Sequence, residues 1–209
     1  MKSFARLVLE RRQPFRIGLI VLQAAAALLF LQATVASAAP PAPAKPNAHV
    51  YLLRGAFNIF SLGMDAMADK LQRPGVTATV ANYVSWPSLA DEAAAEYRSG
   101  RTRTIIIVGH SSGANAVTEM AARLGQLGVP VKLAIGLDPT SQMTASGHID
   151  RYINYYIANG MGTAVRAGPH FSGAIENVDV ERNAALNHFN IDKDRALQDQ
   201  VLRQIRAAL

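Results

Sequence analysis

The sequence predicts an α/β fold with a doubly wound, mostly parallel sheet, and three observations support this class. After residue 48, short β-branched apolar runs alternate with helix-like segments, which is typical of β-α-β units. One run, Thr104–Val108, passes directly into Gly-His-Ser-Ser-Gly at 109–113 and then into a helix-compatible stretch at 114–127. The chain has 209 residues, half of them hydrophobic, which is enough for one domain with a sizeable core.

The expected elements follow in chain order from this alternation. Strands are expected at His49–Leu53, Val76–Ala81, Thr104–Val108, Val131–Leu137, Tyr152–Ile157 and Ile175–Val180. Helices are expected at Ser61–Gln72, Ser88–Ser99, Ala114–Leu127 and from about Asp192 to Ala207. The second helix should begin at a capping box formed by residues 88–91. The last helix repeats apolar residues at the spacing of a face that docks on a sheet.

The first 38 residues are expected to be a secretory signal peptide. Lysine or arginine occurs at positions 2, 6, 11, 12 and 16, an apolar stretch follows at 17–31, and Ala36-Ser37-Ala38 offers a cleavage site. An uncleaved membrane anchor is the alternative, because residues 17–39 are long enough to span a bilayer. Arg11-Arg12 also raises twin-arginine export, which Pro14 disfavours. In each case we expect the protein to act outside the cytoplasm, in the periplasm, the cell envelope or the medium.

The rest of the chain divides into a spacer and one domain. Prolines at 40, 41, 43 and 46 predict a stiff, extended spacer over residues 39–48, and the domain is expected at 49–209. The chain contains no cysteine, so neither a lipoprotein attachment site nor a disulfide is expected. The net charge of +6 comes mostly from the leader, because residues 39–209 hold sixteen basic and fourteen acidic residues. No basic stripe interleaved with aromatic residues remains, so nucleic acid is not an expected partner.

The pentapeptide at 109–113 has the form of a nucleophile elbow. A sharp turn between strand and helix lifts a serine hydroxyl above the sheet, and flanking glycines leave room for the backbone to cross. Ser111 occupies this position. A serine hydroxyl is a poor nucleophile at neutral pH, so it needs a histidine base and a carboxylate that holds this base in the right tautomer.

Asp138 and His188 are the candidates for these two roles. Reacting groups in a doubly wound sheet collect at the carboxyl ends of the strands. Asp138 directly follows the strand expected at 131–137, and His188 lies between the last strand and the last helix. Each has a structural alternative, because an aspartate before a proline can serve a turn and a histidine can pack in a loop. Asp179, in the last strand, is the rival acid, and His148 is the rival base.

In this chain order, Ser111, Asp138 and His188 resemble the triad of α/β hydrolases of the lipase and esterase type. The resemblance covers most of residues 49–209 and rests on G-H-S-S-G, on G-L-D-P at 136–139 and on N-H-F at 187–189. The G-L-D-P context resembles the pancreatic-type lipases, whose acid follows the strand after the nucleophile helix, whereas most of the superfamily places it one strand later. The connection from Asp138 to His188 is too short for a large helical cap, so we expect a compact fold with an open site.

The resemblance also implies an oxyanion hole made of two backbone N–H groups. Ser112, the residue after the nucleophile, should supply one. Ala56 should supply the other, with Phe57 as the fallback, because the segment after the first strand stands where many hydrolases carry His-Gly. Arg54 replaces that histidine, and it should either place a positive charge near the site or pair with a neighbouring acid. Aromatic residues that could line the cleft are Phe57, Phe60, Trp86 and Phe171.

These residues predict a serine hydrolase that cleaves carboxylic ester or thioester bonds through an acyl-enzyme intermediate. The expected partner is a small-molecule or exposed polymer ester or thioester, and a membrane only through an uncleaved N-terminal segment. No cofactor or metal is implied, because no motif for one occurs where it would function. Two alternatives stay open: a non-catalytic binding protein on a hydrolase scaffold, and an acyltransferase that uses the same triad.

Overall fold

The computed structural model describes residues 47–56, 58–59 and 61–209. The expected leader at 1–38 lies outside the described residues, as does the expected spacer except for its last two residues. The described residues belong to one compact unit, Lys45–Leu209. The first strand of this domain begins at Ala48, one residue before the expected start. Among the described residues, no helix is both long and apolar enough to cross a membrane.

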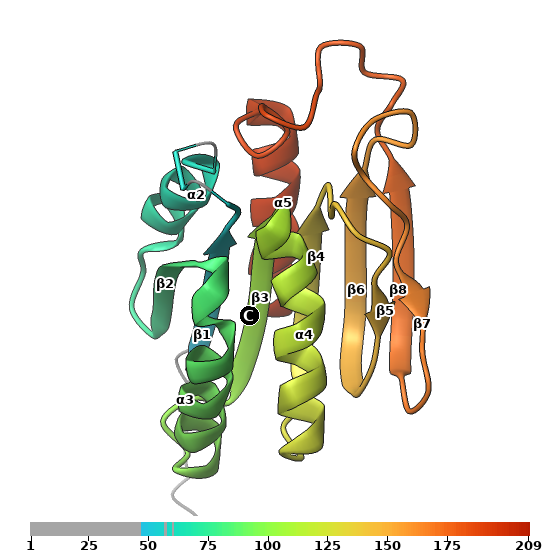
Figure 1. Cartoon of the computed structure of the whole chain (residues 1–209). Helices are drawn as coiled ribbons and strands as arrows, with labels where there is room; N and C mark the ends of the chain where they lie inside the picture. The colour runs from blue at the N-terminus through green and yellow to red at the C-terminus, as the bar shows by residue number, and fades with distance from the viewer. Residues whose placement is uncertain (1–46, 57, 60) are drawn as a thin grey trace, which may run out of the picture. The chain divides into compact units, whose positions relative to one another are not determined.

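A six-stranded sheet forms the centre of the domain (Figure 1). Its strands lie in the order β2-β1-β3-β4-β6-β8, and every neighbouring pair is parallel. The strands are β1 Ala48–Arg54, β2 Val76–Asn82, β3 Thr104–His110, β4 Val131–Leu137, β6 His148–Tyr156 and β8 Ser172–Asp179. The predicted doubly wound parallel sheet is therefore confirmed. All carboxyl ends of its strands meet at one edge, where the site was expected.

Four helices cover the two faces of this sheet. Helices α3 (Trp86–Arg98) and α4 (Ser112–Gln126) pack on one face, and α2 (Gly63–Leu71) and α5 (Arg195–Ala208) pack on the other. Alternate residues of the central strand serve the two cores: Ile105 and Ile107 join the α3–α4 side, whereas Ile106 and Val108 join the α2–α5 side. A strand buried on both faces explains why β3 is a continuous apolar run.

The sheet beyond β4 is built without crossover helices. In the segments that join β4 to β6 and β6 to β8, residues pair as a small parallel sheet of β5 (Thr144–Ala145) and β7 (Arg166–Ala167). Ala145 and Val165 from these segments complete the core on the α3–α4 side. Only strands and turns lie between Asp138 and His188, so this segment contains no helical cap, as expected.

The capping box expected at residues 88–91 is wrong. Helix α3 begins at Trp86, after a 3₁₀ turn at Tyr83–Ser85, and Pro87 lies in its first turn. Proline is suited to that position, because the first N–H groups of a helix have no partner within it. The Ser88 hydroxyl donates instead to the Ser85 carbonyl at 3.0 Å.

Candidate active site

Ser111 occupies a strained turn between β3 and α4. Its backbone has φ 60° and ψ −126°, a region that residues other than glycine rarely adopt. The flanking glycines permit this turn by close approach. A Cβ at Gly109 would lie 2.2 Å from the Gly113 carbonyl oxygen, and one at Gly113 would lie 2.1 Å from the Leu53 carbonyl oxygen. The strand, the serine and the helix therefore have the geometry of a nucleophile elbow.

The structure brings Ser111, Asp138 and His188 together at the carboxyl edge of the sheet. His188 Nδ1 lies 2.6 Å from Asp138 Oδ2, and His188 Nε2 lies 2.9 Å from Ser111 Oγ. A carboxylate can only accept, so Nδ1–H donates to Asp138. In a neutral ring, Nε2 is then left to accept the proton of the Ser111 hydroxyl. This is the arrangement of a nucleophile, a base and an acid that orients the base.

Asp138 is held by its surroundings as well as by His188. The side chain is fully buried, and its second oxygen, Oδ1, accepts from the Ile157 N–H at 2.9 Å. Gly162 packs against the same oxygen so closely that a Cβ there would lie 1.9 Å from Oδ1. A buried carboxylate with hydrogen bonds to both oxygens is fixed in one orientation, as a positioning acid requires.

The rival residues lie elsewhere. The Asp179 carboxylate accepts from the N–H groups of Ala158 and Glu181, at 3.3 and 3.0 Å. His148 begins β6, at the opposite edge of the sheet, and contacts Ser172 Oγ at 2.7 Å and Asp150 at 2.9 Å. Neither rival contacts the Ser111–His188–Asp138 array.

Arg54 pairs with an acid, which was one of its two expected roles. Its guanidinium donates through Nε to Asp65 Oδ2 at 2.9 Å and through a second nitrogen to Asp65 Oδ1. This hydrogen-bonded pairing lowers the pKa of Asp65. The bidentate pair joins the end of β1 to the first turn of α2 and flanks the predicted oxyanion loop.

A pocket of roughly 370 Å³ opens above Ser111. Both predicted oxyanion donors, Ala56 and Ser112, belong to residues that line it, and the fallback donor Phe57 lies outside the described residues. The other lining residues are Ser61, His110, Ser111, Thr140, Met161, His188 and Phe189. The structure therefore gathers the sequence-predicted groups around one space.

Two of the four predicted aromatic wall residues, Trp86 and Phe171, are wrong, and the other two, Phe57 and Phe60, lie outside the described residues. Trp86 and Phe171 pack partly buried against the core on the α3–α4 side. The apolar walls are instead Met161 and Phe189, which are 52% and 55% exposed. Phe189 stands edge-on to the His188 ring, with 5.4 Å between the ring centres. The position of Phe189 directly after His188 in the sequence is the signal that could have identified it as a wall residue.

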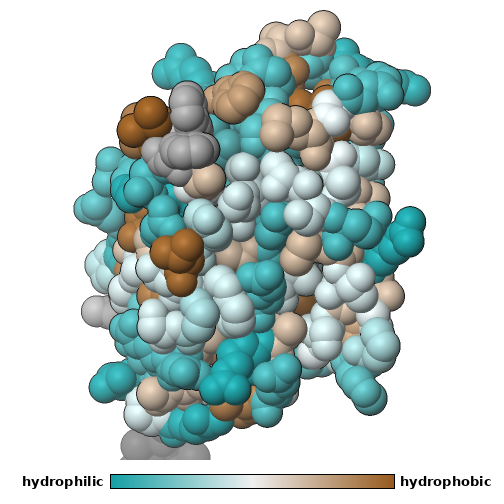
Figure 2. All heavy atoms as spheres, viewed as in Figure 1, coloured by the Kyte–Doolittle hydropathy of each residue, from teal (hydrophilic) through white to brown (hydrophobic). Residues whose placement is uncertain are grey.

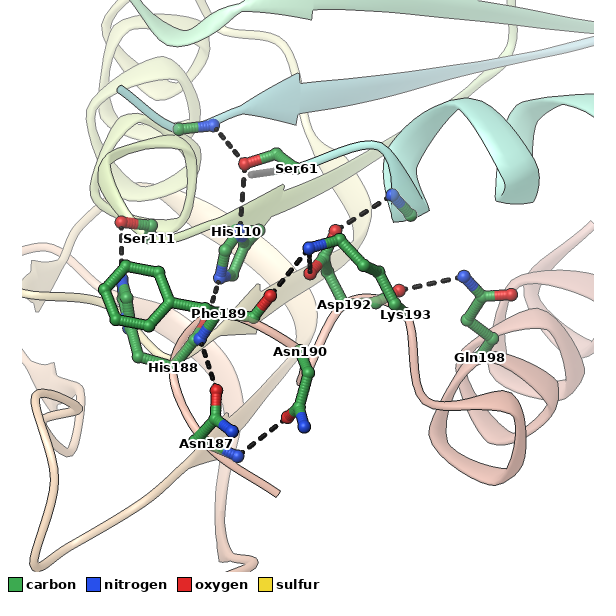
Figure 3. Close-up of polar contacts among 12 residues, drawn as sticks. Ser61, His110, Ser111, Asn187, His188, Phe189, Asn190, Asp192, Lys193 and Gln198 are labelled. Atoms are coloured by element: carbon green, nitrogen blue, oxygen red, sulfur yellow. Dashed lines mark hydrogen bonds and ion pairs between the residues drawn. The ribbon is translucent and has the colours of Figure 1, made fainter. Parts of the chain in front are cut away.

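Sequence reasoning gave no role to His110 or Asp192, and both are buried at this site (Figure 3). The ring nitrogens of His110 contact Ser61 Oγ at 2.9 Å and the His188 carbonyl oxygen at 2.8 Å. Asp192 Oδ2 accepts from the Gly63 N–H at 2.9 Å, at the start of α2. Burial raises the pKa of the Asp192 carboxyl and lowers that of the His110 imidazole. Over the described part of the chain, no three His, Cys, Asp or Glu side chains gather as metal ligands.

Comparison with known proteins supports the fold. No protein-family model matches the chain, and no curated protein does. Among solved structures, the type II thioesterase BorB from the borrelidin biosynthetic cluster is 11% identical, with 82% of this chain and 94% of that chain covered and a TM-score of 0.52.

Two further structures are similar at lower TM-scores. An acetylxylan esterase is 16% identical over 78% of this chain and 98% of that chain, with a TM-score of 0.47. A Xanthomonas campestris protein assigned to the α/β hydrolase superfamily is 14% identical over 76% and 98%, with a TM-score of 0.45. The parallel sheet, the elbow between β3 and α4 and the likeness to BorB together show that this chain has the α/β-hydrolase fold.

Proposed function

We propose that this protein is a serine hydrolase that cleaves carboxylic ester or thioester bonds through an acyl-enzyme intermediate. The observation that carries the proposal is the continuous hydrogen-bonded array from Ser111 through His188 to Asp138, which opens on one pocket. The likeness in fold to a thioesterase agrees with this reaction class and carries no residue assignment.

The first half of the reaction forms the acyl-enzyme. Ser111 Oγ attacks the carbonyl carbon while His188 Nε2 takes its proton, and the Asp138 carboxylate stabilises the imidazolium that results. The carbonyl oxygen becomes an oxyanion, which the N–H groups of Ser112 and Ala56 would hold. As the tetrahedral intermediate collapses, His188 returns the proton to the leaving alcohol or thiol. The second half repeats these steps with water as the nucleophile and releases the acid.

Labelling with a fluorophosphonate probe tests the proposal. Such probes react with activated serines, so the purified protein should gain one adduct by intact mass. The adduct should disappear in Ser111→Ala and fall sharply in His188→Ala. Ser172→Ala is a matched control, because Ser172 also contacts a histidine that contacts an aspartate, but at the other edge of the sheet. Loss of the adduct in Ser172→Ala but not in Ser111→Ala would overturn the assignment.

Export to the periplasm, the cell envelope or the medium is a separate proposal, supported by the charged and apolar pattern of residues 1–38. The mass of the protein recovered from the producing cell tests it. A mature N-terminus at Ala39 would support a cleaved signal peptide, and an intact Met1 end in the membrane fraction would support the anchor instead.

A further inference from the structure

Behind the nucleophile, a buried chain of hydrogen bonds joins the two loops that carry the other proposed catalytic groups (Figure 3). The Gly55 N–H lies 2.9 Å from Ser61 Oγ, and this hydroxyl lies 2.9 Å from His110 Nδ1. On the far side of the ring, His110 Nε2 lies 2.8 Å from the His188 carbonyl oxygen. Ser61 and His110 are each only 1% exposed, so these contacts are largely shielded from solvent.

The chemistry of the two end groups settles the direction of each bond. The His188 carbonyl can only accept, so His110 Nε2 carries the hydrogen. The Gly55 N–H can only donate, so Ser61 Oγ accepts there. Burial lowers the pKa of His110 and favours the neutral ring, although the Asp192 and Asp138 carboxylates act in the opposite direction. In the neutral ring Nδ1 must accept, so the Ser61 hydroxyl donates to it. Every donor therefore has one acceptor.

We propose that His110 and Ser61 are positioning residues, which hold the oxyanion loop at Gly55–Ala56 and the His188 loop in place around Ser111. The inference rests on the proposed function, since it explains how the oxyanion loop and His188 keep their positions relative to Ser111. His110 is a suitable reference point because it is the last residue of β3 and pairs with Leu137 of β4 in the interior of the sheet.

The series of hydrogen bonds begins and ends at backbone groups whose positions matter for the reaction. One end is the backbone of Gly55, directly before the proposed donor Ala56, and a Cβ at Gly55 would lie 2.9 Å from Ser111 Cβ. The other end is the main-chain carbonyl of His188 itself. Errors near 1 Å in such a site cost roughly 100-fold in rate. Loss of these hydrogen bonds should therefore lower kcat far more than it changes KM.

Three variants separate the effect of the hydrogen bond to the His188 carbonyl from the effect of the link through Ser61 to the oxyanion loop. His110→Phe keeps the ring volume and removes both bonds, and kcat for an activated ester should fall about 100-fold with KM nearly unchanged. His110→Gln keeps an N–H donor that can reach the His188 carbonyl, so it should recover about 10-fold of this loss. Ser61→Ala cuts only the link to the oxyanion loop, and kcat should fall about 10-fold.

His49→Phe is the matched control. His49 is also buried, with Glu96 at 2.8 Å from one ring nitrogen and Thr79 at 2.8 Å from the other, but it lies near the start of β1, at the opposite edge. This variant should lose thermal stability while it keeps the kcat of the wild type. An equal loss of kcat in His49→Phe and His110→Phe would assign the effect to folding and overturn the inference. If His110→Phe does not fold, His110→Gln and Ser61→Ala carry the test.

Two readouts separate this inference from the proposed function. If the wild type gives no fluorophosphonate adduct, the proposed function fails. If the wild type reacts and His110→Phe and Ser61→Ala react equally fast, only the positioning role fails. Histidine ¹⁵N NMR of the full chain adds a test that needs no activity: because burial lowers the pKa of His110, the ring should show the neutral Nε2–H tautomer from about pH 7 to 8. A protonated ring or an Nδ1–H tautomer in that range would overturn the assignment.

Discussion

Ser111 and Asp138 directly follow strands β3 and β4, His188 lies between β8 and α5, and the three residues are held by different physical means. Ser111 is lifted by a backbone turn that two glycines make room for. Asp138 is fixed by complete burial and the Ile157 N–H. His188 is oriented by Asp138 through its side chain and by His110 through its backbone. The precision of the site therefore depends on contacts between residues far apart in the sequence.

Asp138→Asn tests the proposed role of the acid. The amide keeps the shape of the carboxylate but favours the wrong tautomer of His188, so kcat/KM should fall by about 10³- to 10⁴-fold. Steady-state kinetics with an activated ester measures the effect. Asp179→Asn is the control, because that carboxylate binds only backbone N–H groups among the described residues. If Asp179→Asn causes the larger loss, the acid is misassigned.

At the scale of elements, the five exposed large hydrophobic residues of the described chain all lie in segments that follow the carboxyl end of a strand. These residues are Ile59, Leu62, Val84, Met161 and Phe189. Figure 2 shows hydrophobic residues at the upper end of the molecule, toward which the strand arrows point in Figure 1. Two of the five line the pocket above Ser111. This clustering suits a substrate whose acyl group is apolar.

Phe189→Ala tests this preference. Removal of the ring takes away apolar surface beside the scissile bond, so kcat/KM should fall more for a hexanoyl than for an acetyl ester, by about 10-fold in the ratio. Competition between the two esters of one alcohol measures that ratio directly. Val84→Ala is the control, since Val84 is 64% exposed and does not line the pocket. An unchanged ratio in Phe189→Ala would exclude Phe189 from acyl recognition.

The segment after His188 is joined to α2 by Asp192. The carboxylate accepts from the Gly63 N–H, so it caps a helix that lies far away in the sequence. Asp192 Oδ1 is buried and has no hydrogen-bond partner among the described residues, with the Lys193 ammonium 3.9 Å away. This environment explains why burial raises the pKa of the carboxyl.

At neutral pH, the Asn and Ala variants of Asp192 should have different effects on the free energy of unfolding. Because the folded state raises the pKa of Asp192, the folded state binds more protons, and this group reduces stability as pH rises above its unfolded value. Asp192→Asn keeps an acceptor without the charge, so its free energy of unfolding should equal or exceed that of the wild type. Asp192→Ala should lose about 1 to 2 kcal/mol. Urea unfolding at neutral pH measures both, and a less stable Asn than Ala variant would contradict the account.

At the scale of the whole molecule, stability should be uneven across the sheet. Strands β3 and β4 are almost completely buried. In contrast, most residues of β8, which is the outermost strand on one side of the sheet, are exposed. Local opening costs less where few apolar contacts are lost. Amide hydrogen exchange should therefore be slowest in β3 and β4 and much faster in β8. Equal protection in the three strands would show that the domain opens only as one unit.

Much of the fold could be predicted because the strands are locally encoded. Val131–Leu137 was predicted with its observed bounds, because every residue of this run except Lys132 is nonpolar and buried. Strand β6 begins at His148, four residues before the predicted start. Of its first four residues only Ile149 is buried, and a register shift between Ile149 and Arg151 interrupts the alternation that would have indicated a strand. The two-residue strands β5 and β7 are too short to leave a period in the sequence.

The candidate site divides in the same way. Ser111, Asp138 and His188 could be chosen because each directly follows, or lies beyond, the carboxyl end of a strand. The contacts of His110 with Ser61 and His188 join residues 49 and 78 positions apart, and no local pattern encodes them. Aromatic type alone did not separate wall from core, because Trp86 and Phe171 pack inward while Phe189 lines the pocket.

The order of the site residues along the chain has a consequence for synthesis. Ser111 and Asp138 are made early, but their histidine and the carboxylate that caps α2 come only with the segment before α5. A nascent chain that ends at β6 carries a nucleophile without a base, and the first turn of α2 lacks the carboxylate that caps it. On the proposed mechanism, such a chain is inert toward esters, and hydrolytic activity begins only when the segment that carries His188 is translated and folded against the sheet.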